Sequence, residues 1–167
     1  MRKLIPFLLA ALLVAAIAVV NAQEEAEAVE KPWFDLENCG FCKNLLTDGL
    51  IEHLTWETFV VPTGMMEVTT VEPGWEDKYA TCLATMEETG KKMMAGETVP
   101  MCGMCQSYGT MFMTNKVEWK NFDTKAGHIS LMTSTDPEVI AMVHAHAERT
   151  IDEYAKMEAA EMEKMEE

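Results

Sequence analysis

Hydrophobic and polar residues alternate, imperfectly, over two pairs of short segments. The first pair covers residues 55–61 and 65–71, joined by a Pro-Thr-Gly turn. The second pair covers residues 117–122 and 128–133, joined by a polar segment that ends in glycine. Segments of this length, rich in β-branched and aromatic residues and separated by turn-forming residues, are typical of β-hairpins. The pattern therefore predicts four strands in two hairpins.

Helices are expected on both sides of each hairpin. Short helical stretches should precede the hairpins, over residues 44–52 and 107–115, and a longer helix should follow each of them. In the last helix Asp136 is a natural N-cap and Pro137 suits the first helical position. Apolar residues of the two long helices recur at helical spacing, in the first at Trp75, Tyr79, Cys82, Met86 and Met93 and in the second at Val139, Val143, Ala147, Ile151 and Tyr154.

The two halves of this pattern repeat one another after 63 residues. Each half opens with a Cys-x-x-Cys pair, Cys39/Cys42 and Cys102/Cys105, and 8 of the 32 positions that begin at Cys39 are identical after the shift. Chance would give about two identities. Two copies are too few for a solenoid and indicate a pseudo-twofold domain. We predict an α+β fold in which duplicated helix-strand-strand-helix units form a four-stranded antiparallel sheet with packed helices.

The first residues have the features of a secretory signal peptide. Arg2 and Lys3 precede an apolar run that reaches Val20, and small residues follow at Asn21 and Ala22. An uncleaved membrane anchor is the alternative interpretation. We expect a signal peptide over 1–22, an acidic tether over 23–35, a single duplicated domain over 36–157 (copy one 36–98, copy two 99–157) and an acidic tail over 158–167. The mature protein should be periplasmic or secreted.

Acidic residues outnumber basic ones by 28 to 13, which gives a net charge of −15. Removal of the signal peptide would take away two basic residues and no acidic one. Nucleic acid is a poor partner for such a chain, because binding it requires basic residues that neutralise phosphates. The charge also disfavours anionic membranes, and we expect no stable membrane insertion after signal cleavage. The sequence identifies no protein partner.

The paired cysteines favour a site for a soft metal ion. A Cys-x-x-Cys at a helix start places two sulfurs within reach of one ion, and the helix N-terminus favours the thiolate form. Both pairs could bind one tetrahedral zinc, or each copy could form its own site. The duplication favours separate sites because Cys82 aligns with His146. The expected ligands are thus Cys39, Cys42 and Cys82 in copy one and Cys102, Cys105 and His146 in copy two, with His144 as a further ligand from the other flank.

Copper has a slight advantage over zinc as the expected ion. The chain contains 15 methionines, several of them near the cysteines. Thioether, thiolate and imidazole ligands together suit copper(I), whereas zinc does not bind methionine. Three other interpretations remain open. Exported cysteines are often oxidised to structural disulfides, the Cys-Gly-x-Cys pairs are similar to thiol-disulfide exchange motifs, and Cys82 and His146 could simply belong to the core. No motif of an enzyme active site is present in the sequence, so we expect no catalytic activity.

The residues around the cysteine pairs, with those from Leu131 to Pro137 and from His144 to Ala147, resemble exported bacterial proteins that carry a duplicated Cys-x-x-Cys unit and have no assigned function. The resemblance extends over nearly all of the mature chain. It implies a bacterial source and adds no activity or ligand. A metal-binding function is therefore predicted from the residues alone, with a disulfide-stapled interaction module as the alternative and a thiol-disulfide redox protein as a further one.

Overall fold

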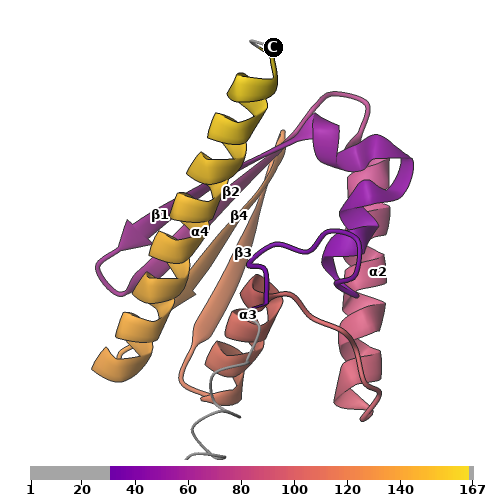
Figure 1. Cartoon of the computed structure of the whole chain (residues 1–167). Coiled ribbons are helices and arrows are strands. Elements are labelled where there is room, and N and C mark those ends of the chain that lie inside the picture. The colour runs from indigo at the N-terminus through magenta and orange to yellow at the C-terminus, as the bar shows by residue number, and fades with distance from the viewer. Residues whose placement is uncertain (1–30, 166–167) are drawn as a thin grey trace, which may run out of the picture. The chain divides into compact units, whose positions relative to one another are not determined.

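A computed structural model of the chain describes residues 31–165 (Figure 1). The predicted signal peptide, most of the predicted tether and the last two residues of the tail lie outside this range. In chain order the elements are η2 (Cys42–His53), β1 (Leu54–Val61), β2 (Gly64–Val71), α2 (Glu76–Met94), α3 (Gly103–Met113), β3 (Glu118–Thr124), β4 (Gly127–Thr133) and α4 (Pro137–Met165).

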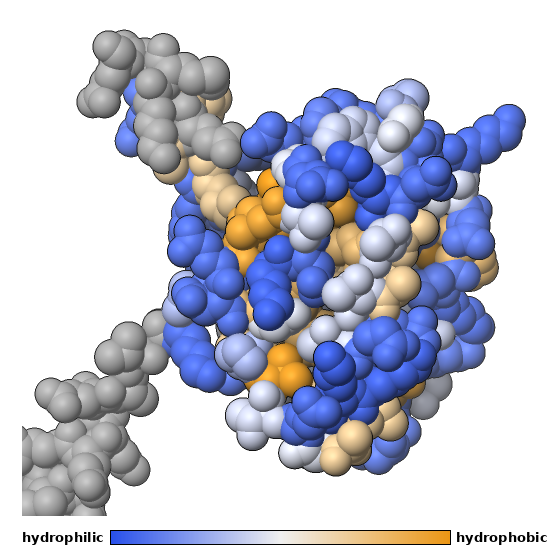
Figure 2. Space-filling view, turned by 90° about the vertical axis from the view of Figure 1, so that its right-hand side faces the viewer, coloured by the Kyte–Doolittle hydropathy of each residue, from blue (hydrophilic) through white to orange (hydrophobic). Residues whose placement is uncertain are grey.

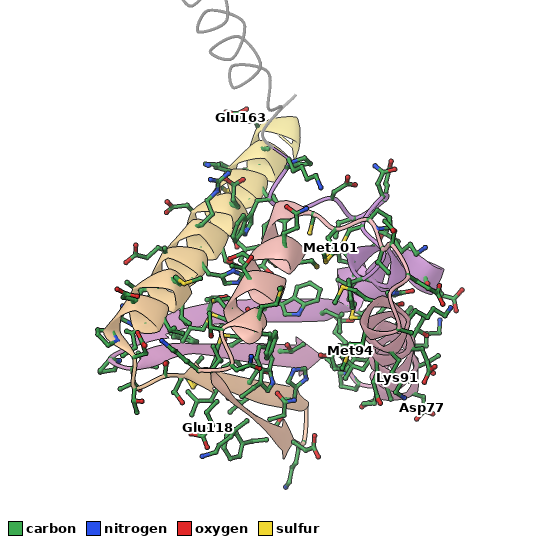
Figure 3. The ribbon with its side chains drawn as sticks, turned by 90° about the horizontal axis from the view of Figure 1, so that it is seen from below. Asp77, Lys91, Met94, Met101, Glu118 and Glu163 are labelled. Carbon is green, nitrogen blue, oxygen red and sulfur yellow. The ribbon has the colours of Figure 1, made fainter. Side chains whose placement is uncertain are left out.

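The four strands form one antiparallel sheet in the order β1-β2-β4-β3. Each hairpin keeps its two strands together, and the hairpins join along β2 and β4 at the centre of the sheet. The predicted fold class is confirmed, with strand ends that differ from the expected ones by no more than two residues. α3 and α4 lie over one face of the sheet (Figures 1 and 3).

The register of the sheet has the symmetry of the duplication. Glu67 in β2 lies opposite Ser130 in β4, and these two positions are related by the 63-residue shift. On either side of this pair, Met66 lies opposite Leu131 and Val68 opposite Ile129, and the same shift exchanges these two pairs. A local twofold axis therefore passes between Glu67 and Ser130 and relates the two hairpins.

Gly64 and Gly127 allow the central strands to approach closely. A Cβ atom at Gly64 would lie 1.9 Å from the carbonyl oxygen of Met132, and one at Gly127 would lie 2.0 Å from the carbonyl oxygen of Thr69. The two contacts are equivalent under the twofold relation. Because a backbone oxygen cannot move aside as the end of a side chain can, only glycine fits these positions without separating β2 from β4.

Two core clusters fill the space between the sheet and the helices. In one, Met65 and Met132 of the central strands pack with Met111 of α3 and Val143 of α4. The other is built from η2, β1, β2 and α2, and its buried members are Leu50, Leu54, Val71, Tyr79 and Cys82. η2 packs on α2 as α3 packs on α4. Each copy therefore joins its first helix to its last, as the repeat implies.

η2 is less regular than its counterpart α3. It is a 3-10 helix with a break in which Thr47 is extended and Asp48 and Gly49 adopt left-handed conformations, with φ values of 57° and 77°. Glycine adopts this conformation without cost, and aspartate tolerates it better than most residues do. The predicted helical stretch over residues 44–52 therefore contains a turn.

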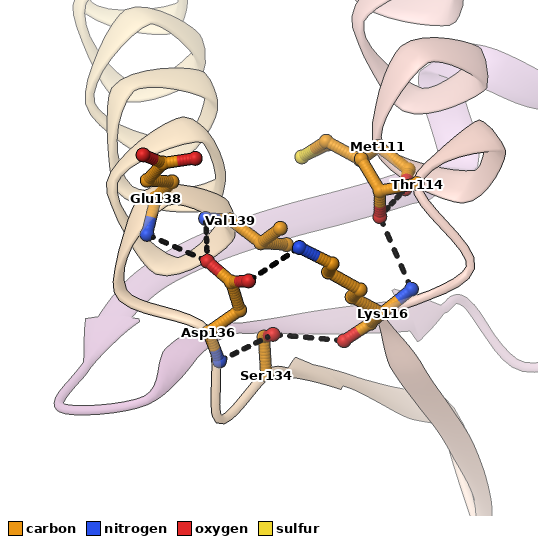
Figure 4. A network of polar contacts seen from close by, with 7 residues as sticks. All are labelled: Met111, Thr114, Lys116, Ser134, Asp136, Glu138 and Val139. Carbon is orange, nitrogen blue, oxygen red and sulfur yellow. Dashed lines mark hydrogen bonds and ion pairs between the residues drawn. The ribbon is translucent and has the colours of Figure 1, made fainter.

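The predicted start of the last helix is confirmed (Figure 4). Asp136 Oδ1 accepts the amide hydrogens of Glu138 and Val139, at 2.9 and 3.4 Å, and Lys116 Nζ contacts Asp136 Oδ2 at 2.6 Å. The Lys116 ammonium holds the pKa of Asp136 below its usual range. Ser134 Oγ accepts the Asp136 amide hydrogen and donates to the Lys116 carbonyl, so the cap also joins α4 to the start of β3. α4 continues to Met165, beyond the expected domain end at 157.

Hydrophilic residues cover most of the side of the molecule on which α2 lies (Figure 2). Most acidic side chains of α2 are exposed, as expected for a chain of this composition. None of the helices between residues 31 and 165 is both long enough and apolar enough to span a membrane.

Candidate metal centre

The two Cys-x-x-Cys pairs meet at one place. The sulfur atoms of Cys39, Cys42, Cys102 and Cys105, which we call the cysteine cluster, all lie within 4.8 Å of one another. Cys39 Sγ is 3.5 Å from Cys105 Sγ, and Cys42 Sγ is 3.7 Å from Cys102 Sγ and 3.6 Å from Cys105 Sγ. We expected one site per copy, whereas the structure brings both copies' cysteines together.

Both pairs stand at helix starts, as the sequence predicts. Cys102 is the N-cap residue of α3, and Cys42 is the first residue of η2. The carbonyl oxygen of Cys39 accepts the amide hydrogen of Lys43 at 3.1 Å, and that of Cys102 accepts the amide hydrogen of Gln106 at 3.0 Å. Each pair is therefore wound into one helical turn that brings its two sulfurs onto the same side. The free amide groups of this turn favour negative charge on sulfur.

Backbone hydrogen bonds link copy two to copy one and to the segment just before it, and they hold the two turns together. The Gly40 amide donates to the carbonyl oxygen of Pro100 at 2.8 Å. On the other side, the amides of Gly103 and Met104 donate to the carbonyl oxygens of Pro32 and Trp33, both at 3.0 Å. Figure 1 shows the indigo segment before η2 running beside the start of α3. Segments that are distant in the sequence thus surround the cysteine cluster.

The cysteine cluster is enclosed by apolar side chains. Cys39, Cys42 and Cys102 are at most 2 % exposed, and only Cys105 is partly accessible. Leu36, Phe41 and Met104 pack around the sulfurs. Water therefore has little access to three of the four sulfurs.

The proximity of four thiol groups changes their acidity. Hydrogen bonds from the thiols of Cys105 and Cys42 hold the pKa of Cys102 far below its usual range. The same hydrogen bonds raise the pKa values of Cys105 and Cys42 above the usual range, and burial raises them further. One thiolate is therefore favoured within the cluster before any other group ionises. A bound cation would favour ionisation of the remaining thiols, because its charge stabilises thiolates.

The sulfur separations fit a tetrahedral metal site. Four sulfurs at about 2.3 Å from a zinc ion would lie roughly 3.8 Å from one another. Three of the six sulfur pairs are 3.5–3.7 Å apart, and all six lie within 4.8 Å. A disulfide requires sulfur atoms about 2.05 Å apart. All five cysteines lie within the described residues, and none of them is at bonding distance from another. The arrangement is thus compatible with four ligands to one ion.

Three further residues were expected to contribute ligands. Cys82 lies in the core between η2 and α2, and burial raises the pKa of its thiol. Nδ1 of His146 is 2.9 Å from Ser107 Oγ of α3, and Nε2 of His144 is 2.9 Å from the carbonyl oxygen of Val61. None of the three belongs to the cysteine cluster.

The equivalence of Cys82 and His146 is nevertheless visible in the structure. Each lies between the first and the last helix of its own copy. His146 is 2 % exposed, its Nε2 has no hydrogen-bond partner among residues 31–165, and burial lowers the pKa of its ring to about 4. The imidazole is therefore uncharged at neutral pH and packs between the rings of Trp33 and Tyr108. The exchange of cysteine for histidine conserves a core position of the repeat.

A buried carboxyl group near the centre of the sheet was not anticipated. Glu67 stands at the twofold axis on the helix-covered face, where it accepts a hydrogen bond of 2.5 Å from the hydroxyl of Tyr108. Burial raises the pKa of Glu67, although this hydrogen bond acts in the opposite direction. Burial and the nearby carboxylate raise the pKa of Tyr108 in turn. The sequence signal is the position of Glu67 between Met65 and Thr69, whose side chains share its face of β2.

Replacing this carboxyl group should stabilise the protein at neutral pH. The pKa of Glu67 is higher in the folded chain than in the unfolded chain. The wild-type protein therefore loses stability as the pH rises between these two pKa values, where the folded chain must give up a proton that the unfolded chain no longer holds. Glu67→Gln keeps an oxygen that accepts the Tyr108 hydroxyl and removes the buried charge. At pH 8 we expect the free energy of unfolding of Glu67→Gln to exceed that of the wild type by roughly 1 kcal/mol. At pH 4 we expect no difference.

Urea unfolding of both chains between pH 4 and 8 measures this difference. Glu52→Gln, at an exposed position of η2, serves as the control and should leave the pH profile unchanged. A constant offset between wild type and Glu67→Gln at all pH values would contradict the expectation, because it would mean that Glu67 does not titrate in this range.

Comparisons of the chain with protein-family models, with curated proteins and with solved structures find no match. The candidate function is therefore argued from the geometry of the cysteine cluster.

Proposed function

We propose that this chain is an exported protein that binds one soft metal ion through Cys39, Cys42, Cys102 and Cys105. The observation that carries the proposal is the grouping of four sulfur atoms from two distant segments within 4.8 Å. Four buried thiol groups in contact are costly unless they share a ligand or a covalent bond, since buried polar groups require partners. A single ion would satisfy all four.

Zinc is the ion that this ligand set supports best. Tetrahedral sites with four thiolates are typical of zinc and of iron-sulfur centres, whereas copper(I) was favoured from the sequence because of the methionines and the expected histidine ligand. His146 lies outside the cysteine cluster, which removes half of that argument. Met104 packs against the cluster, so copper remains the second candidate.

The role of the ion would be structural. Structural zinc sites have four protein ligands, while catalytic sites keep one position open for water or substrate. The cysteine cluster is buried and supplies four ligands, two from each copy of the repeat. The sheet joins the two copies along β2 and β4. A bound ion would join them at a second place, the starts of η2 and α3.

Metal analysis of the mature protein tests the proposal. Protein secreted in vivo and purified without chelator should contain about one metal ion per chain, and X-ray absorption should show sulfur ligands at about 2.3 Å if the ion is zinc. Cys42→Ser and Cys105→Ser should each lose the ion. Cys82→Ala, at a buried cysteine outside the cluster, should retain it.

A thiol count on the same samples separates the alternatives. Metal-bound wild-type protein should release five thiols after denaturation with chelator, because none of the five cysteines is at disulfide-bonding distance from another. Absence of metal together with one free thiol in the denatured protein would overturn the proposal and would indicate two structural disulfides. A single pair that exchanges rapidly with glutathione would instead support the redox interpretation.

A further inference from the structure

The face of the sheet turned away from α3 and α4 carries an apolar patch. Side chains alternate between the two faces of a strand, and the core residues Met65, Val71 and Met132 identify the covered face. Glu118, labelled in Figure 3, projects from the opposite face. Six apolar residues of that opposite face form what we call the outer patch, namely Phe59, Met66, Val68, Phe122, Ile129 and Leu131.

The outer patch belongs to none of the core clusters of the described residues. Its two phenylalanines are 41 % and 50 % exposed, and its four central residues are partly exposed. Scattered apolar residues are normal on a protein surface, but contiguous apolar patches mark interaction sites. Six neighbouring apolar residues on a sheet face that no described helix covers indicate a partner.

The strand register arranges the outer patch in two rows across the sheet. One row runs Phe59, Met66, Leu131 and Lys120, and the other runs Glu57, Val68, Ile129 and Phe122. The 63-residue shift converts one row into the other. The phenylalanines thus occupy one pair of opposite corners, while Lys120 and Glu57 occupy the other pair. Between these two rows and the ends of the strands, the same face includes threonines.

The placement of charge on this face fits a second copy of the chain. Besides Glu118 at the start of β3, the face carries Lys120 and Glu57, one residue of each sign at opposite corners of the two rows. Lys120 contacts Glu118 on its own strand at 2.8 Å, but both side chains are exposed, and such pairs contribute little to stability. Lys120 can therefore turn to a new partner at little cost.

We propose that two copies of the chain pack face to face through the outer patch, with Lys120 of each copy next to Glu57 of the other. A twofold axis in the plane of the interface makes the same patch serve both copies. An in-plane axis perpendicular to the line from Lys120 to Glu57 places Lys120 of each copy over Glu57 of the other, whereas an in-plane axis along that line brings like charges together. The charges therefore select the first axis, which leaves the strands of the facing sheets inclined to each other, as is usual for packed sheets.

The size of the face is sufficient for a dimer of moderate affinity. Four strands at about 4.8 Å spacing and about eight residues at roughly 3.3 Å per residue give a face of roughly 500 Å². Two copies would bury about 1,000 Å² together, at the lower limit of specific interfaces. We expect a dissociation constant on the order of micromolar. This interface uses none of the metal-site residues and stands whether or not the metal proposal does.

Sedimentation velocity of the mature chain over a range of concentrations tests the dimer. Wild-type protein should change from monomer to dimer on the order of 1–10 µM. Phe122→Glu should remain monomeric, and Leu83→Glu, at an apolar position of α2 that is also exposed, should behave as wild type. Circular dichroism on each variant verifies that the fold is retained.

Charge exchange distinguishes this interface from any other. Glu57→Lys alone and Lys120→Glu alone should each weaken the dimer by roughly tenfold or more, because like charges then meet at both ends. The double variant Glu57→Lys/Lys120→Glu should regain the dimer. A wild-type chain that stays monomeric at about 100 µM, or a double variant no better than the single ones, would overturn the proposal. A monomer whose outer patch binds lipid vesicles would also overturn it and would assign the patch to a membrane surface.

Discussion

Removal of the metal ion should lower the thermal unfolding midpoint by roughly 10 °C or more. An ion present at about 1,000 times its dissociation constant stabilises the folded state by about 4 kcal/mol, and for a chain of this size that corresponds to a shift of this order. The reason is specific to the fold. The cysteine cluster joins two segments, before η2 and before α3, that the described contacts connect mainly through a few backbone hydrogen bonds.

The measurement is calorimetry of the purified protein with and without a strong chelator, under reducing conditions. Cys42→Ser should melt near the chelator-treated wild type and should not respond to chelator. Hydrogen exchange would locate the change, with faster exchange at the amides of Gly40 and Met104 and little change in the centre of β2 and β4. Equal midpoints with and without chelator would contradict a structural role for the ion.

The second large effect is expected from Gly127→Ala, which should destabilise the protein by roughly 3 kcal/mol or more. The new Cβ would lie 2.0 Å from the carbonyl oxygen of Thr69, and Gly127 has a φ of 139°, which side chains rarely allow. Strands β2 and β4 would have to separate where the two copies join. Because both core clusters include residues of β2, separating β2 from β4 would disturb the packing of both clusters.

Urea unfolding compares Gly127→Ala with Gly109→Ala as a matched control. Gly109 lies in α3, where a Cβ meets nothing within 4 Å, so alanine should be neutral or stabilise the helix by up to about 1 kcal/mol. Gly64→Ala should resemble Gly127→Ala, because the duplication places it in the equivalent contact with Met132. If Gly127→Ala unfolds like the wild type, the close approach of the central strands is not required.

Local sequence patterns were sufficient for the elements of this fold. Turn residues and alternation located both hairpins, because these signals act between residues that are near one another in the chain. The Asp136-Pro137 helix start could be predicted for the same reason, since a cap is formed by neighbouring residues. The repeat after 63 residues predicted two equivalent units in one antiparallel sheet, and the register of β2 with β4 carries the same symmetry.

The composition of the cysteine cluster could not be decided in this way. The alignment of Cys82 with His146 is real, but equivalent positions in a repeat can face a core as readily as a ligand. In the structure the first helix of each copy packs on its own last helix, so Cys82 and His146 are enclosed within their separate copies. Glu67 could not be assigned either, because its burial depends on which face of β2 the helices cover.

The sequence by itself therefore determined the elements, their duplication and the residue types that could bind a metal, since each depends on local spacing or on comparison of one half with the other. Only the tertiary structure decided that Cys39 and Cys42 meet Cys102 and Cys105 in one cluster, and that no helix between residues 31 and 165 covers the outer face of the sheet. Both outcomes depend on how the two copies pack around the twofold axis. That packing is set by contacts between residues some 60 positions apart, which no local pattern records.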